Sequence, residues 1–331
     1  MMKVFIFLLI MMFLFFIGCE NDILEYVGPA YQNAIYIMDG DGNNKEKIID
    51  TDCRNVQFIP GTDKILYVKN GSDTDTLFIA NDDGSEIMII CDELELSSSN
   101  PIFSANGQFC YIKVLSDEWS TSDIYEFDLI NNSYRNLTNN HWIGIQTFDY
   151  KENTLVYSLG RVYDICTVLK LNLSNIQLDT LFIVQENTYL NPVIFGETTN
   201  EIYFSWSGTD ILCRIYKMDI AENIIDTLTT VIYGCGLTYT SNNNLFLDDT
   251  HSDIIHIDLL SNNLTSLVVG RFPDFHNELM LFSTISDDYD SEVRRLNLSN
   301  MENLSITSHG FKPKYSENGE KIVFIGVEQI Y

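Results

Sequence analysis

The sequence predicts an all-β fold built from one four-stranded unit repeated along the chain, which is the architecture of a β-propeller. A strand motif of the form aliphatic-aromatic-x-x-Asp/Asn recurs with a mean spacing of 43 residues, close to the ~40–50 residues of a propeller blade. The runs around the motif are rich in Ile, Tyr, Phe and Val, which favour strands. Polar turn residues separate these runs, so each repeat supplies four short strands that bury both faces only by packing against other copies.

The N-terminal segment carries the features of an export signal. Lys3 precedes fourteen consecutive apolar residues, too few for the ~20 of a membrane-spanning helix but enough for the ~7–15 of a signal-peptide core. The run ends in Phe-Ile-Gly18-Cys19, which resembles the lipobox of bacterial lipoproteins. The resemblance implies that residues 1–18 are a cleaved signal peptide and that Cys19 carries the lipid, with residues 19–34 as a tether. An uncleaved anchor and an ordinary secretory signal remain alternatives.

Residues 35–331 carry seven copies of the repeat. The residue that closes the motif stands at Asp39, Asn81, Asp128, Asn172, Asp219, Asp258 and Asn297. Seven blades are favoured by this count, and six are possible if one short unit is not a blade. Because the segment begins with the third and fourth strands of a unit and ends with the first two, we expect the N- and C-terminal strands to pair and close the ring, which removes exposed sheet edges.

Two of the turns identify a family resemblance. Asn106-Gly107 and Asn318-Gly319 stand where TolB-like (WD-repeat-like) β-propellers carry Ser-Pro-Asp-Gly, and Asp123-Ile-Tyr-Glu-Phe-Asp128 is similar to their Asp-Ile-Tyr-x-x-Asp strand. The resemblance is strong in the second and seventh units and thin in the sixth, where residues 273–277 replace the turn. It implies a TolB-like propeller over 35–331. With the lipobox, it implies a lipid-anchored protein of the bacterial cell envelope, on a periplasmic or surface face.

The net charge limits the classes of partner that this chain is expected to bind. Nineteen Lys and Arg against 47 Asp and Glu give a net charge of −28, which repels nucleic acid and favours cationic partners, including a weakly bound divalent cation.

Seven Cys are present and no C-x-x-C motif occurs. We expect the six that are not lipidated to be mostly free and buried, although their even number permits disulfides.

No catalytic motif is found, since the sequence has neither Gly-x-Ser-x-Gly nor His-Glu-x-x-His. The only dense group of potential ligands is Asp249, His251, Asp253 and His256. It is interpreted as a polar loop with His256 facing outward from the third strand of its unit, and the alternative is a metal site, because residues 249, 251 and 253 would share one face of a strand. The prediction is therefore a non-enzymatic binding or scaffolding module without cofactor or metal, whose partner is an envelope protein or a small ligand on a propeller face. Two alternatives are a lyase or hydrolase with its site in the central channel, and a surface lipoprotein that captures glycans or peptides for a transporter.

An acidic residue precedes the third strand in six of the units. These residues are Asp75, Asp123, Asp164, Asp210, Asp253 and Asp290. Each carboxylate is expected to accept hydrogen bonds from its own turn, and together they form a ring on one rim that attracts cations. If calcium binds, we expect it near residues 287–290, where carboxylate oxygens are densest.

Overall fold

The computed structural model describes residues 30–72, 74–97, 99–115, 121–139, 144–160, 166–184, 189–207, 212–232, 234–240, 244–249, 253–261, 263–284 and 291–330. The chain divides into a large compact unit, Gln32–Glu328, and a small one formed by Met1–Tyr31 with Gln329–Tyr331. Every regular element in the described ranges is a β-strand, so the all-β prediction is confirmed. No helix able to cross a bilayer is found in those ranges.

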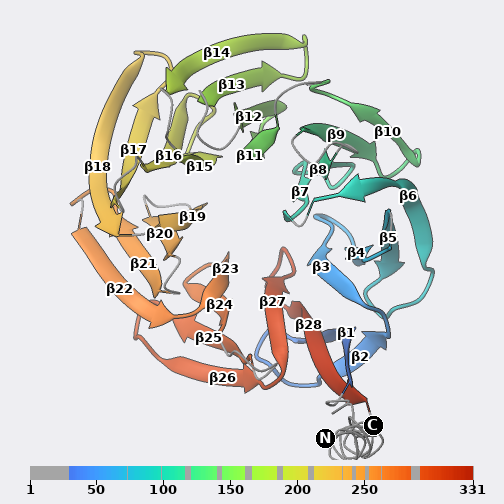
Figure 1. The fold of residues 1–331 in the computed structure, drawn as a ribbon. Coiled ribbons are helices and arrows are strands. Elements are labelled where there is room, and N and C mark those ends of the chain that lie inside the picture. The colour runs from blue at the N-terminus through green and yellow to red at the C-terminus, as the bar shows by residue number, and fades with distance from the viewer. Residues whose placement is uncertain are drawn as a thin grey trace, which may run out of the picture. The chain divides into compact units, whose positions relative to one another are not determined.

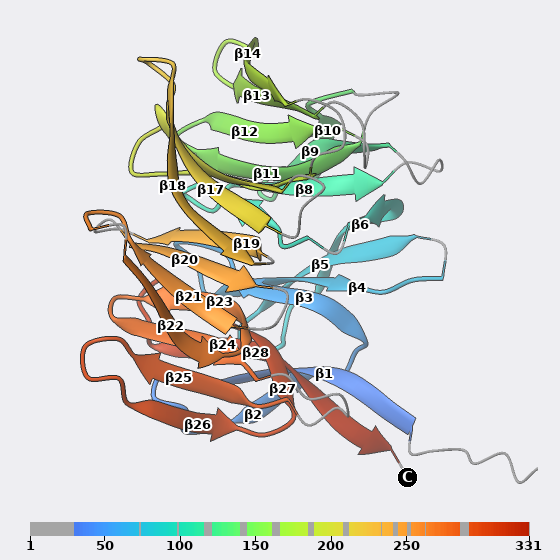
Figure 2. The ribbon, with the colours of Figure 1, turned by 60° about the vertical axis from the view of Figure 1, so that its left-hand side comes forward.

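Six antiparallel sheets make up the large unit (Figure 1). One sheet joins the two ends of the chain in the order β2-β1-β28-β27, and β1 and β28 run alongside each other in Figure 2. Its strands are β1 (Ala30–Asp39), β2 (Glu46–Ile49), β27 (Gly310–Tyr315) and β28 (Lys321–Ile330). Since β1 begins at Ala30, the last residues expected to be tether belong to a strand. The expected signal peptide and Cys19 lie outside the described residues.

The next sheet has eight strands because one long strand is shared. It contains β3 (Cys53–Phe58), β4 (Lys64–Lys69), β5 (Asp75–Asn81), β6 (Met88–Leu96), β7 (Ile102–Phe103), β8 (Phe109–Leu115), β9 (Ser122–Asp128) and β10 (Ser133–Asn136). Strand β6 pairs with β5 and then, through Glu95 and Leu96, with β8. Strand β7 is only two residues long, so the end of β6 supplies part of the pairing that β8 would otherwise lack.

Four further sheets each contain four consecutive strands. They are β11 (Ile145–Lys151), β12 (Thr154–Leu159), β13 (Cys166–Asn172) and β14 (Gln177–Val184); β15 (Tyr189–Phe195), β16 (Glu201–Ser207), β17 (Leu212–Asp219) and β18 (Ile224–Ile232); β19 (Gly234–Thr240), β20 (Asn244–Asp249), β21 (Asp253–Asp258) and β22 (Asn263–Val269); β23 (Arg271–His276), β24 (Leu279–Ser283), β25 (Val293–Asn297) and β26 (Asn303–Thr307).

The hydrophobic core lies between successive sheets. Val156 and Val168 of one sheet share a cluster with Leu190 and Phe204 of the next, and Tyr203 in turn belongs to the cluster that continues into the sheet β19–β22. Strand β5 alternates buried and half-buried side chains along most of its length, as a pleated strand packed on both faces does. Face-to-face packing of this kind explains why one repeat alone has no stable core.

In Figure 1 the innermost strands are the first strands of the repeats, β3, β7, β11, β15, β19, β23 and β27. Strand β27 contacts both β23 and β3, β11 contacts β7 and β15, and β15 contacts β19. Six of these inner strands carry an irregularity of register at the same end, between the pairs Cys53/Asn55, Ile145/Thr147, Leu190/Val193, Gly234/Gly236, Arg271/Asp274 and Phe311/Lys314. A bulge of this type re-aims side chains, so these positions decide which groups face inward.

The two turns that carry the family resemblance have the same geometry. In each, the Asn carboxamide oxygen accepts both the Ser hydroxyl and a backbone N–H: Ser104 Oγ and Gln108 N for Asn106, Ser316 Oγ and Glu320 N for Asn318. The following glycine has a positive φ, +67° at Gly107 and +73° at Gly319, which side-chain-bearing residues rarely adopt. The Ser-x-Asn-Gly sequence therefore encodes a tight connection between first and second strands.

Candidate functional site

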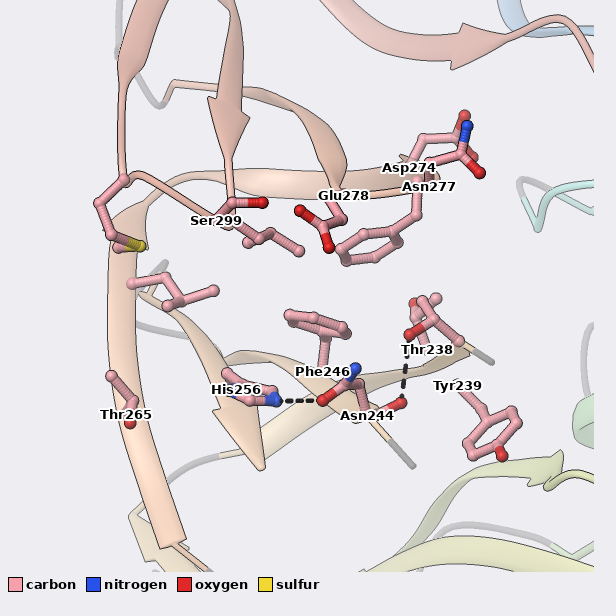
Figure 3. Close-up of a pocket in the computed structure, with 15 residues that line it drawn as sticks. Thr238, Tyr239, Asn244, Phe246, His256, Thr265, Asp274, Asn277, Glu278 and Ser299 are labelled. Atoms are coloured by element: carbon pink, nitrogen blue, oxygen red, sulfur yellow. Dashed lines mark hydrogen bonds between the residues drawn. The ribbon is translucent and has the colours of Figure 1, made fainter. Parts of the chain in front are cut away.

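A cleft of about 1070 Å³ opens between the sheets β19–β22 and β23–β26, as the close-up in Figure 3 shows. It lies at the end of the large compact unit where β19 ends and β20 begins, and where the turns β23–β24 and β25–β26 are found. A volume of this size is at the upper end of the ~300–1,000 Å³ of ligand sites. Neither the β19–β20 nor the β23–β24 turn carries the Ser-x-Asn-Gly sequence.

One wall of the cleft is a row of side chains that crosses all four strands of a sheet. Thr238 lies opposite Phe246, Phe246 opposite His256, and His256 opposite Thr265. Residues directly opposite one another project from the same face of a sheet, and all four line the cleft. Phe246 is only 2% exposed and therefore forms the floor, while the other three remain half-buried or exposed.

The second wall is formed by the end of β23 and the turns of the neighbouring sheet. Asp274, Phe275, Asn277 and Glu278 come from β23 and its turn, and Leu298, Ser299 and Met301 come from the turn after β25. In Figure 3 the Glu278 carboxylate and the His256 ring lie on opposite walls of the cleft. The half-buried Phe275 ring packs against Phe246 with a centroid distance of 4.3 Å, which joins the two walls at the floor.

His256 is held in one orientation. Its Nε2 lies 2.7 Å from Asn244 Oδ1, and its ring stacks on Phe246 with a centroid distance of 5.1 Å. Since an amide oxygen only accepts, Nε2 carries the proton and Nδ1 is the acceptor of the neutral ring. Burial lowers the pKa of His256, and the Asp258 carboxylate opposes this only in part. The site thus presents a neutral imidazole at neutral pH.

Among the described residues, the lining contains two acids and no lysine or arginine. Asp274 accepts hydrogen bonds from Lys314 Nζ at 3.0 Å and from Tyr315 N at 2.7 Å, so its charge is compensated. Glu278 is exposed. Amide, hydroxyl and imidazole groups surround half-buried aromatic rings, an arrangement that suits an uncharged polar ligand with an apolar face.

A smaller cleft of about 550 Å³ lies between the turns β3–β4 and β27–β28. Polar links cross it: Gly61 N donates to Glu317 Oε2 at 2.8 Å, and the Lys321 ammonium pairs with the Asp82 carboxylate. These links join the two walls of the smaller cleft, whereas the walls of the larger cleft are joined by an aromatic floor. The smaller cleft is accordingly the weaker candidate.

Three of the six predicted acidic residues lie in the described ranges. Asp75 is buried and accepts Arg54 Nη2 at 2.6 Å and Leu96 N at 2.9 Å. Asp123 accepts Asn136 Nδ2 at 2.9 Å and Thr138 Oγ1 at 2.8 Å. Asp253 is the half-buried first residue of β21. Asp164, Asp210 and Asp290, with the expected calcium region at 287–290, lie outside the described residues.

Asp75 accepts one hydrogen bond from the turn before its own strand, from Gly71 N at 3.5 Å, but its shorter bonds, and those described for Asp123, come from residues in or just after neighbouring strands. The ring of six acids stays a prediction. Within the described ranges no three His, Cys, Asp or Glu side chains gather where they would hold a metal ion. Five cysteines of the described ranges are buried thiols that form no disulfide, as expected: Cys53, Cys91, Cys110, Cys166 and Cys213.

The cleft itself is not apparent in the sequence. The prediction places His256 in the third strand of its unit, facing outward; it does lie in that strand, β21, but it lines the cleft. The row of Thr238, Phe246 and Thr265 depends on strand register, which single residues do not reveal. The usable signal is the weak sixth unit, where residues 273–277 replace the turn motif and form part of the second wall.

Comparisons with known proteins identify the fold. No family model matches the sequence, and no curated protein is significantly similar to it. Among solved structures, TolB from Acinetobacter baumannii superposes with a TM-score of 0.57 at 14% identity, over 82% of this chain and 66% of that protein. An oligogalacturonate lyase in complex with manganese gives 0.67 at 9% identity, over 90% and 97%. A puromycin-hydrolyzing peptidase of Mycobacterium tuberculosis gives 0.62 at 10% identity, over 84% and 52%.

These similarities establish a TolB-like β-propeller fold, as the turn motifs predicted. They also correct the expectation that the chain is not an enzyme. Propellers of the same fold include a lyase and peptidases, so the absence of familiar catalytic motifs does not exclude catalysis.

Proposed function

We propose that this chain is a ligand-binding propeller of the bacterial cell envelope, held at the membrane by lipid on Cys19, and that its ligand occupies the cleft between β19–β22 and β23–β26. The observation that carries the proposal is the row of Thr238, Phe246, His256 and Thr265 facing Phe275 and Glu278 across about 1070 Å³. The lipobox-like sequence before Cys19 supports the anchor, and the similarity to TolB is compatible with this location.

The proposal includes a ring of seven blades. The described strands number 28, four for each of seven blades if the eight-stranded sheet counts as two. The sheet β2-β1-β28-β27 supplies the seventh blade from both ends of the chain. Residues 1–18 are the signal peptide in this proposal, and the tether is the segment between Cys19 and β1.

The ligand that suits the cleft is a neutral saccharide. Sugars combine hydroxyl groups with an apolar C–H face, and half-buried aromatic rings next to amide and hydroxyl groups match both. The described part of the lining has no Lys or Arg, and this together with the net charge of −28 disfavours anionic ligands. A cell-envelope lipoprotein with this site would capture glycan fragments.

Calorimetric titration with three neutral hexasaccharides, cellohexaose, maltohexaose and chitohexaose, tests the proposal. We expect one of them to bind, and Phe275→Ala to weaken that binding by roughly tenfold or more, as loss of an aromatic contact in a site does. Thr62→Ala in the smaller cleft is the matched control and should leave affinity unchanged. Binding that survives Phe275→Ala, or binding of a protein partner that ignores all cleft substitutions, would contradict the proposal.

Catalysis in the same cleft is the second candidate. A neutral imidazole with an acceptor Nδ1 and the Glu278 carboxylate lie on opposite walls, as a general base and a second proton-transfer group do in lyases and hydrolases. If this is correct, His256→Ala abolishes turnover of the bound saccharide, whereas Thr265→Ala lowers it only slightly. Bound saccharide that is recovered intact after prolonged incubation would rule this candidate out.

A further inference from the structure

A second group of polar side chains lies on the inner strands β3, β23 and β27, apart from the cleft residues. The bulges in β23 and β27 place Phe272 and Lys312 at equivalent positions, with φ of +57° and +50°. Such backbone angles are uncommon for residues with side chains and cost energy. Lys312 reaches the first residues of β3, and the Phe272 ring lies beside its ammonium.

Lys312 is a half-buried cation that has no acidic partner among the residues that the structure describes. Its Nζ donates to the Arg54 carbonyl oxygen at 2.7 Å and to Asn55 Oδ1 at 3.0 Å, and lies 5.4 Å from the centre of the Phe272 ring. All three partners are uncharged, and in the described residues no carboxylate forms an ion pair with it. Burial, with a smaller contribution from the Arg54 charge, lowers the pKa of Lys312 to about 8.

The groups around Lys312 leave one positive charge uncompensated. Arg54 pairs with Asp75 at 2.6 Å, and Lys314 pairs with Asp274 at 3.0 Å. Arg54 Nε is buried and makes no hydrogen bond in the part of the chain that the structure describes. Burying an unpaired ammonium is unfavourable unless an anion accompanies it. The chain as a whole, with a net charge of −28, repels anions. The cluster around Lys312 differs, because its uncompensated positive charge attracts them.

We infer that Lys312 is the anchor of a second binding site, for a small organic monocarboxylate whose carboxylate accepts the Lys312 ammonium and whose apolar body lies on Phe272. One uncompensated cation matches one negative charge, and the field of the acidic chain disfavours ions with several charges. The Phe272 ring is 38% exposed and provides an apolar surface beside the ammonium. Simple inorganic anions lack the group that would contact this ring.

The probe for this site is benzoate, with inorganic phosphate and sulfate for comparison. Lysine side chains labelled with ¹³C at Cε report the ionisation of each ammonium. We expect benzoate to move the Lys312 resonance and to raise its pKa above 8, since a bound anion favours the charged form. The resonance of Lys170 should not respond, although its Nζ also donates to a backbone carbonyl and an Asn side chain, Thr199 O and Asn200 Oδ1.

Two substitutions separate the site from a general charge effect. Lys312→Met should weaken benzoate binding about tenfold or more, the effect of one hydrogen bond to a charged group, and Phe272→Ala, at an exposed position, should weaken it several-fold without disturbing the fold. Lys170→Met, the matched control, should bind as the wild type does. Tighter binding of phosphate or sulfate than of benzoate, or equal benzoate affinity in wild type and Lys312→Met, would overturn the assignment. So would a Lys312 resonance that does not change with benzoate. Because no cleft residue takes part, these outcomes are independent of saccharide binding.

Discussion

The two clefts at the turn end of the propeller differ in what joins their walls. The larger one, between β19–β22 and β23–β26, has a floor where Phe246 packs against Phe275. The smaller one is crossed by the Lys321–Asp82 ion pair and by the hydrogen bond from Gly61 N to Glu317. Equivalent positions of a repeated fold thus become either a fastened junction or an open site, depending on a few side chains in the turns.

The largest expected effect on stability comes from removing the buried phenylalanine at the floor of each cleft. Phe246→Ala removes a side chain that is 2% exposed, and we expect the free energy of unfolding to fall by about 3–5 kcal/mol. Phe58→Ala in the smaller cleft, at 9% exposed, should cost a similar amount. Urea unfolding monitored by circular dichroism measures both. A loss below ~1 kcal/mol for Phe246→Ala would mean that the open cleft is not built on a packed floor.

The next largest expected effect on stability comes from two glycines, one in the turn β3–β4 and one in the turn β27–β28. Gly319 and Gly61 both have positive φ, +73° and +71°, but an added Cβ at Gly319 would lie 2.2 Å from His276 Cδ2, whereas Gly61 has open space. Gly61→Ala should cost about 1–2 kcal/mol for the backbone angle alone, and Gly319→Ala about 1–3 kcal/mol more for the steric conflict. In a His276→Ala background the difference should disappear. If Gly319→Ala cost the same free energy of unfolding with and without the His276 side chain, the imidazole ring would be moving aside freely.

The polar links of the smaller cleft have a weaker expected effect. The Lys321 side chain is 44% exposed, and exposed ion pairs contribute at most about 1 kcal/mol. We expect Lys321→Met and Asp82→Asn each to lower the free energy of unfolding by less than this, and the double variant to cost no more than one of them. The difference from wild type should shrink in 1 M salt, where screening is strong. Additive costs would exclude a direct interaction.

The smallest effect is a pH dependence at the larger cleft. The pKa of His256 in the folded protein is lowered from its ordinary value of 6.5, so the unfolded chain binds the proton more tightly. The stabilisation from the neutral ring is present above pH 6.5 and is lost as the pH falls from there toward the lowered pKa. His256→Gln should flatten the stability profile in this window. Parallel profiles for wild type and His256→Gln would contradict the burial of this ring.

The fold was more predictable than the site because they depend on different information. Repeat spacing, β-branched and aromatic runs and the Asn106-Gly107 and Asn318-Gly319 turns report local structure, and the structure has strands and turns where these signals lie. The cleft depends on the register that aligns Thr238 with Phe246 and His256, and on the absence of a turn motif in the weak sixth unit. The acidic residues form a repeated pattern in the sequence, yet Asp75 and Asp123 accept hydrogen bonds from residues in or just after neighbouring strands, Leu96 N and Thr138 Oγ1.

Carbon-13 labelling of histidine at Cε1 and of lysine at Cε, followed by titration with the three neutral hexasaccharides, compares the two clefts in a single sample. If the open cleft is the ligand site, one saccharide shifts the His256 resonance in a saturable way and leaves the Lys321 resonance unchanged. A saturable shift of Lys321 with His256 unmoved, or no response at either residue, would contradict the assignment of the binding site to the cleft between β19–β22 and β23–β26.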